Sequence, residues 1–218
     1  MGMFNNFLSL IKINKEKMTV LVVGLNNSGK SSIIQQFKRK NDTNSYISIP
    51  TVGFTHEEFY SKHKNPNKNH TKVNIKKITF FYSGQGVQFS VIDMSGAWKY
   101  RNLWQHQFKN CQGLIYVIDA SDKMRMVVVK EELDILLQHP DLVNRSIPIL
   151  FYGNKSDCDN SLSSVNIASA LELTSICDKP WHICCCSAKT GDGLEEGVQW
   201  LIQQIRNLTH KKDKHKKK

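Results

Sequence analysis

The octapeptide GLNNSGKS at residues 24–31 constrains the fold more than any other stretch of this chain. It follows a β-branched run, MTVLVVG (18–24), and opens a segment with helical spacing, KSSIIQQFKRK (30–40). The pattern G-x-x-x-x-G-K-[ST] between a strand and a helix lets backbone N–H groups surround phosphate oxygens at a helix N-terminus. A glycine-containing turn that binds nothing is the alternative. The residues predicted to contact a nucleotide here are Gly24, Leu25, Asn26, Asn27, Ser28, Gly29, Lys30, Ser31 and Ser32.

Strand-like and helix-like segments alternate along the rest of the chain. Further strands are predicted at 87–93, 113–119, 147–154 and 181–187, and helices at 124–139, which Pro140 is expected to stop, at 163–173 and at 193–208. Residues 78–93 read as a hairpin with Gly84-Gln85 as its turn. The pattern predicts an α/β fold of the P-loop nucleotide-binding class, with a mostly parallel six-stranded sheet and helices on both faces.

Two later motifs indicate which base is bound. In NKSD (154–157), Asp157 is placed to accept hydrogen bonds from guanine N1–H and its exocyclic amine, a pair of donors that adenine lacks. Asn154 is expected to contact the other face of the base, and the Lys155 stem to cover its plane. CSAK (186–189) ends the last strand, where the Ala188 N–H is predicted to meet guanine O6, flanked by Ser187 and Lys189. Guanine is therefore favoured over adenine, and a nucleoside kinase or ATPase is disfavoured.

Two segments are predicted to sense the terminal phosphate. In IPTVGF (49–54), Thr51 is placed to contact Mg²⁺ and the γ-phosphate; in DMSG (93–96), Asp93 would hold Mg²⁺ through water, and the Gly96 N–H would detect the γ-phosphate. Ser31 completes this metal set, and Lys30 would reach the β- and γ-phosphates. The alternatives are that Thr51 is an ordinary loop residue and that Asp93 caps a helix.

Ala97 follows Gly96 at the position where GTPases ordinarily carry a glutamine that orients the attacking water. A methyl group cannot orient water, the nearby SGQG (83–86) does not fit the motif, and residues 42–52 contain no arginine. Intrinsic hydrolysis is therefore expected to fall below the roughly 10⁻⁴ per second of an unassisted small GTPase. No side chain is assigned a catalytic role. A scaffold that never hydrolyses GTP, and a partner that supplies the missing group, both remain open.

The net charge of +11 lies in two appendages. Residues 61–77 hold six Lys and no acid, and residues 210–218 hold six Lys and one Asp, so the remainder is formally neutral. This distribution argues against nucleic acid as a partner. Residues 60–77 are predicted to be a disordered insertion, and 209–218 a basic tail. The six cysteines lack metal-site spacing and are expected to be reduced thiols.

The first residues predict an amphipathic helix over 1–17, ahead of a nucleotide-binding domain over 18–208. Its apolar face is formed by Met3, Phe4, Phe7, Leu8 and Ile11. Gly2 is a possible myristoylation site, although Asn6 stands where the pattern wants Ser or Thr. A helix packed permanently on the domain is the alternative to a membrane contact. No run of roughly 18 apolar residues and no signal-peptide pattern is found.

Together these motifs resemble the ADP-ribosylation-factor-like family of small GTPases across about residues 1–208. The strings DMSG with YRNLW, RMVVVKEELDILLQHPD, IPILF and DKPWHIC are similar to a ciliary branch of that family. The resemblance implies a monomeric GTP/GDP switch with Mg²⁺ that docks on membranes when GTP-loaded and recruits a ciliary trafficking coat, the BBSome. It also implies an exchange factor, an activating protein, and a cytoplasmic, peripheral-membrane location at the cilium or basal body. The insertion at 60–77 departs from the family, in which the hairpin between the two switches slides.

Overall fold

Strand β1 (Glu16–Val23) lies at the centre of the sheet. Its side chains are buried on both faces of the sheet. The computed structural model describes residues 16–42, 54–59, 73–82 and 87–216. Met18, Val20 and Val22 pack into one hydrophobic cluster, and Leu21 and Val23 pack into a second on the opposite face. A strand with two apolar faces needs helices on both sides of the sheet.

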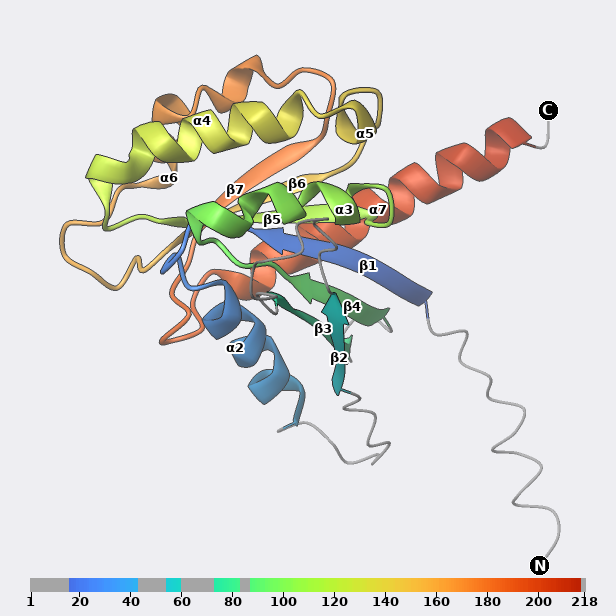
Figure 1. Ribbon diagram of the computed structural model, residues 1–218, viewed down its shortest axis with the longest axis horizontal. Helices are drawn as coiled ribbons and strands as arrows, with labels where there is room; N and C mark the ends of the chain where they lie inside the picture. Colours follow the sequence, from blue (N-terminus) through green and yellow to red (C-terminus); the bar gives the residue numbers. More distant parts are fainter. Residues whose placement is uncertain (1–15, 43–53, 60–72, 83–86, 217–218) are drawn as a thin grey trace, which may run out of the picture.

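The sheet has seven strands in the order β2-β3-β4-β1-β5-β6-β7 (Figure 1). Strands β4 (Val87–Asp93), β5 (Gly113–Asp119), β6 (Ile149–Asn154) and β7 (Trp181–Cys185) form one parallel array with β1. Strands β2 (Phe54–Phe59) and β3 (Val73–Tyr82) add an antiparallel edge. The predicted mostly parallel sheet is confirmed, with β2 as the strand beyond the six expected.

Two predicted boundaries are wrong. Residues 73–77, expected to belong to a disordered insertion, form the first half of β3, where they pair with β2 and, from Lys76 onward, also with β4. These ladders satisfy the backbone polar groups, which outweighs the Asn- and Lys-rich composition. Similarly, Glu16 and Lys17 belong to β1 and pair with β4, so the expected N-terminal helix does not reach residue 17. Residues 1–15, 60–72 and the hairpin turn at 83–86 lie outside the described part.

Helices cover both faces of the sheet, as predicted (Figure 1). Helices α2 (Lys30–Asp42) and α7 (Leu194–Lys216) pack Ile33, Phe37 and Leu201 into the cluster on one face. The opposite face is covered by the 3₁₀ helix η2 (Trp98–Leu103) and by α3 (Gln105–Phe108), α4 (Met126–Leu137) and α6 (Ser164–Ala170). Two single 3₁₀ turns, η3 (Lys123–Arg125) and η4 (Leu173–Ser175), adjoin these helices.

Two helix ends differ from the sequence expectation. Pro140 ends the predicted helix as expected, but it also begins a short helix of its own, α5 (Pro140–Val143). Proline suits the first helical position because its missing N–H has no partner there. At the other end of the chain, α7 continues to Lys216, so the backbone of most of the predicted basic tail is helical. Of the helices described, none combines the length and the apolarity needed to cross a membrane.

Candidate nucleotide-binding site

The loop between β1 and α2 forms a cradle of backbone. Gly24 (φ +136°) and Gly29 (φ +95°) adopt backbone angles that L side chains rarely reach. A Cβ on Gly24 would lie 2.1 Å from the Val117 carbonyl oxygen. Asn27 between them also has a left-handed φ of 64°. The loop therefore curls tightly at the N-terminus of α2, in the shape that a phosphate-binding loop requires.

Lys30 directs its ammonium group into this cradle. Its side chain is buried, and Nζ donates hydrogen bonds to the carbonyl oxygens of Gly24 (3.0 Å) and Leu25 (2.8 Å). Burial lowers the pKa of Lys30 to about 8, while the nearby Asp93 carboxylate opposes that shift. A partly desolvated ammonium that donates to two neutral carbonyls gains strongly from an anionic partner. The geometry fits the predicted contact with phosphate.

Ser31 and Asp93 meet beside this lysine, as the predicted metal set requires. The Ser31 hydroxyl donates to Asp93 Oδ2 at 2.5 Å, joining the start of α2 to the end of β4. A hydroxyl and a carboxylate are the oxygen ligands that Mg²⁺ prefers, so the pair fits this metal. The alternative that Asp93 caps a helix is wrong, because Ala97 stands at the start of η2. Thr51 lies outside the described residues.

Gly96 packs directly on the phosphate loop. Its carbonyl oxygen accepts hydrogen bonds from the Asn26 N–H and from Arg101 Nε, both at 3.0 Å. A Cβ on Gly96 would lie 2.3 Å from the Leu25 carbonyl carbon, so a side chain has no room there. The segment after β4 is thereby joined to the phosphate loop through main-chain atoms. Detection of the γ-phosphate by the Gly96 N–H stays a prediction.

Ala97 stands half-buried at the start of η2, where its carbonyl accepts from the Tyr100 N–H at 2.9 Å. The nearby Arg101 does not compensate for the short side chain, because its guanidinium is already bonded. Arg101 Nη1 lies 2.6 Å from Glu132 Oε1, and both side chains are largely buried. Arg101 thus braces η2 against α4.

Asn154, at the end of β6, joins the phosphate loop to the predicted base-binding loop. Its side chain is 2 % exposed. Nδ2 donates to the Ser28 carbonyl at 2.8 Å, and Oδ1 accepts from the Ala188 N–H at 2.9 Å. Asn154 therefore acts as a brace, a role that the sequence did not predict. Its contact with the base, and the contact of the Ala188 N–H with guanine O6, stay predictions.

Asp157 is exposed and held in place by Ser187. The Ser187 hydroxyl donates to Asp157 Oδ1 at 2.7 Å and accepts from the N–H groups of Lys189 and Thr190, each at 3.2 Å. The bond from Ser187 lowers the pKa of Asp157 below its ordinary value. An anchored, ionised carboxylate with free lone pairs is suited to accept two donors from one ligand edge.

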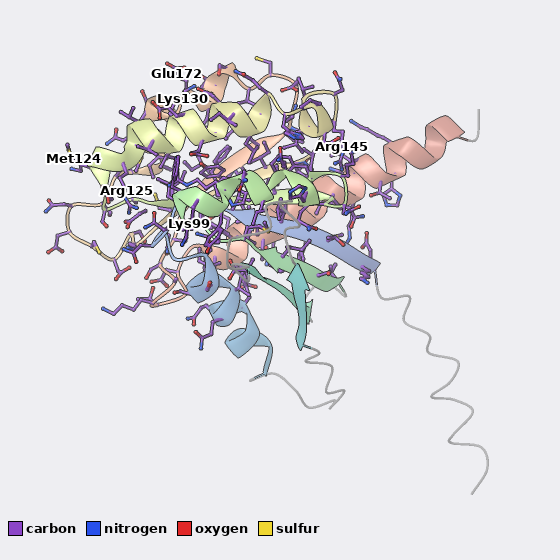
Figure 2. The ribbon with its side chains drawn as sticks, in the orientation of Figure 1. Lys99, Met124, Arg125, Lys130, Arg145 and Glu172 are labelled. Atoms are coloured by element: carbon purple, nitrogen blue, oxygen red, sulfur yellow. The ribbon has the colours of Figure 1, made fainter. Side chains whose placement is uncertain are left out.

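Two residues beside the site were missed from the sequence. Asp119 ends β5, and its Oδ2 accepts from Lys155 Nζ at 2.6 Å. Burial raises the pKa of Asp119, but hydrogen bonds from Lys155 and Ser121 outweigh it, so the net shift is downward. Arg125, at the amino-terminal end of α4 (Figure 2), donates from Nη1 to the Asn26 carbonyl at 3.0 Å. Asp119 stands at the carboxyl end of a predicted buried strand, where ligands bind in sheets of this kind. The sequence therefore contained a signal for this residue.

A groove of about 490 Å³ lies between η2, α3 and α4. Trp98 and Ile135 line it and are 81 % and 67 % exposed, whereas Trp104 lies 3 % exposed and donates from Nε1 to the Ser95 carbonyl. Of the aromatic residues in this segment, Trp104 therefore belongs to the core and Trp98 to the surface.

Comparison with known proteins gives a consistent result. A model of the ADP-ribosylation factor family matches residues 4–205. ADP-ribosylation factor-like protein 6 of Danio rerio is 44 % identical over 208 residues, which cover 95 % of this chain and 99 % of the relative. The Caenorhabditis elegans protein of the same name is 36 % identical over 205 residues, covering 94 % and 95 %. Among solved structures, the Arl6 BBS3 small GTPase of Trypanosoma brucei with the nucleotide analogue GppNp has a TM-score of 0.64 at 31 % identity, covering 88 % of this chain and 98 % of that one.

Proposed function

The chain belongs to the ADP-ribosylation factor family of small GTP-binding switches, and from this premise we propose that it cycles between GTP and GDP to recruit a ciliary trafficking coat. In the GTP state it would dock on membranes through the residues that precede β1 and bind the coat, the BBSome. Its location would be cytoplasmic and peripheral to the membrane of the cilium or basal body. An exchange factor and an activating protein would drive the cycle, and the switch would act as a monomer.

The observation that carries this proposal is the meeting of three motifs at the carboxyl edge of the sheet. Asn154 ties the phosphate loop to the loop that contains Ala188, and the ionised Asp157 stands beside them. This arrangement supports simultaneous recognition of phosphates and of guanine. Ser31 and Asp93, together with Thr51, would hold Mg²⁺. When bound, the ion neutralises phosphate charge, while Lys30 and the backbone of the cradle orient the phosphates.

Nucleotide competition tests base selection. GTP and GDP are expected to displace a fluorescent guanine nucleotide from the purified chain, and ATP is not. Replacing Asp157 by Ala should weaken guanine nucleotide binding by at least about tenfold, because two hydrogen bonds to a charged group are lost. Asp159→Ala is the matched control, since that carboxylate is exposed in the same turn. Equal displacement by ATP, or unaltered affinity in Asp157→Ala, would refute the assignment.

Ala97 supports slow intrinsic hydrolysis within this cycle. Its methyl group cannot orient a water, and Arg101 is engaged with Gly96 and Glu132. The family's GTP hydrolysis is therefore proposed to depend, in this chain, on a partner that supplies the missing group. A scaffold that never hydrolyses GTP is the second candidate, and the same alanine favours it.

Membrane docking is tested by sedimentation with anionic liposomes. The GTP-loaded chain should pellet with the vesicles more than the GDP-loaded chain, and deletion of residues 2–13 should abolish pelleting while leaving nucleotide binding intact. Apolar residues on one face of a short helix supply the expected affinity. Unchanged pelleting of the deletion variant would overturn this part of the proposal.

A further inference from the structure

Strand β7 presents two metal-ligating side chains on the same face. His182 and Cys184 are two residues apart, and alternate residues of a strand share a face. The packing agrees: Cys184 belongs to the cluster under α7, whereas Trp181 and Ile183 pack against the cluster on the opposite side. β7 is also an edge strand, so this face opens to solvent along one side.

Helix α7 brings a third ligand to the same place. The Tyr152 hydroxyl donates to the Leu194 carbonyl at 2.5 Å, and a Cβ on Gly197 would lie 2.7 Å from the Tyr152 ring, so the helix approaches the sheet closely here. Glu196 stands between these two contacts. Its Oε1 lies 3.8 Å from His182 Nε2.

The imidazole of His182 is held from a second side. Its ring stacks on Trp200, with centroids 5.3 Å apart and an interplanar angle of 29°. Trp200 lies one helical turn after Glu196, so the two side chains share a face of α7. The ring therefore lies between strand and helix, with Nε2 3.8 Å from the Glu196 carboxylate.

We propose that His182, Cys184 and Glu196 form a binding site for Zn²⁺. Their ligand atoms all lie within 4.8 Å of one another. Around a tetrahedral zinc with ligands at about 2.0–2.3 Å, those atoms would be about 3.3–3.7 Å apart. Closing the difference needs about 1 Å of movement at most, and rotation of the 75 % exposed Glu196 side chain can provide the part that concerns its carboxylate.

The donor set selects the metal class. A thiolate with an imidazole and a carboxylate favours zinc and its neighbours over Mg²⁺, which takes oxygen ligands. Solvent reaches the site through the exposed sides of His182 and Glu196, so water would complete the tetrahedron. Of the three consecutive cysteines at 184–186, Cys184 alone belongs to this set.

Bound zinc would hold β7 and α7 together. These two elements precede and follow the predicted base-binding loop in the sequence. Residues 187–189 lie between Cys184 and Glu196 in the sequence. A metal that joins the two ends of this segment restricts the conformations of the loop within it.

The site is tested on the full chain loaded with GDP and excess Mg²⁺. Equilibrium dialysis should show about one Zn²⁺ retained per chain, and Co²⁺ as a probe should give a thiolate-to-cobalt charge-transfer band with tetrahedral visible bands. The nucleotide-linked metal site contains no thiolate and cannot produce that band. Glu196→Gln and His182→Ala should each weaken Zn²⁺ binding at least about tenfold, since even outer-shell partners of a metal cost 10–100-fold.

Neighbouring residues supply matched controls. Cys184→Ala should abolish the charge-transfer band, whereas Cys185→Ala, on the other face of the strand, should retain it. Glu195→Gln, one residue from Glu196, should bind Zn²⁺ as the natural chain does. If Cys184→Ala fails to fold, the exposed Glu196→Gln still decides the question. Absence of Zn²⁺ retention by the natural chain, equal loss in the control variants, or unchanged binding in Glu196→Gln would each overturn the proposal.

Discussion

Replacing Asn154 by Ala should lower the free energy of unfolding by about 2–4 kcal/mol. The side chain is 2 % exposed and makes two hydrogen bonds, one to the Ser28 carbonyl and one from the Ala188 N–H. Each bond contributes about 1 kcal/mol net, and each buried group left without a partner costs about 1–3 kcal/mol. The cost at the Ser28 carbonyl should lie in the upper part of that range, because Ser28 is buried. The cost at the Ala188 N–H should lie in the lower part, because Ala188 is half-buried and water can replace the lost partner.

Urea denaturation of the nucleotide-free chain measures this change, because with nucleotide present any loss of affinity would add to the apparent loss of stability. Asn160→Ala is the control: that asparagine is exposed, and its loss should change the free energy of unfolding by less than about 0.5 kcal/mol. Asn154→Asp keeps the acceptor for Ala188 but directs a carboxylate at the Ser28 carbonyl, so it should cost at least as much as Ala. An Asn154→Ala variant as stable as Asn160→Ala would refute the brace.

Three further predictions concern hydrolysis, pH and the aromatic residues. Ala97→Gln should accelerate single-turnover GTP hydrolysis by the chain alone, and equal rates would remove the role assigned to this position. Because the folded pKa of Lys30 is about 8, below its ordinary 10.5, the unfolded chain binds more protons between these values. The stability of the nucleotide-free chain relative to Lys30→Met should therefore rise with pH in that window, by at most about 1.4 kcal/mol per pH unit in urea titrations; a flat difference would contradict the burial argument. Trp104→Ala should cost about 3–5 kcal/mol of unfolding free energy, while Trp98→Ala should cost less than about 0.5 kcal/mol.

A structural feature was predictable from the sequence where all the residues that it needs lie in one short segment. The phosphate loop was predicted because strand, glycines and helix are contiguous, and the left-handed angles at Gly24 and Gly29 follow from the same eight residues. The meeting of Ser31 with Asp93 was also expected, because the two motifs that contain them assigned both residues to one Mg²⁺.

Contacts between distant segments were not predictable in the same way. The Asn154–Ser28 bond joins residues 126 positions apart, and the Arg125–Asn26 bond joins residues 99 apart. Each depends on which strands are neighbours and on their register, and periodicity specifies neither. Composition also misled at residues 73–77, where pairing with β2, and with β4 from Lys76 onward, outweighs the Lys and Asn content.

The joint between Asn26 and Gly96 consists only of main-chain atoms, at a point where no Cβ fits. Substitution of the next side chain, at position 97, therefore leaves that link chemically unaltered. Under the proposed function, sensing a nucleotide and hydrolysing it would therefore depend on different atoms of the same short segment. Such a chain would hydrolyse GTP slowly and still respond to which nucleotide it holds.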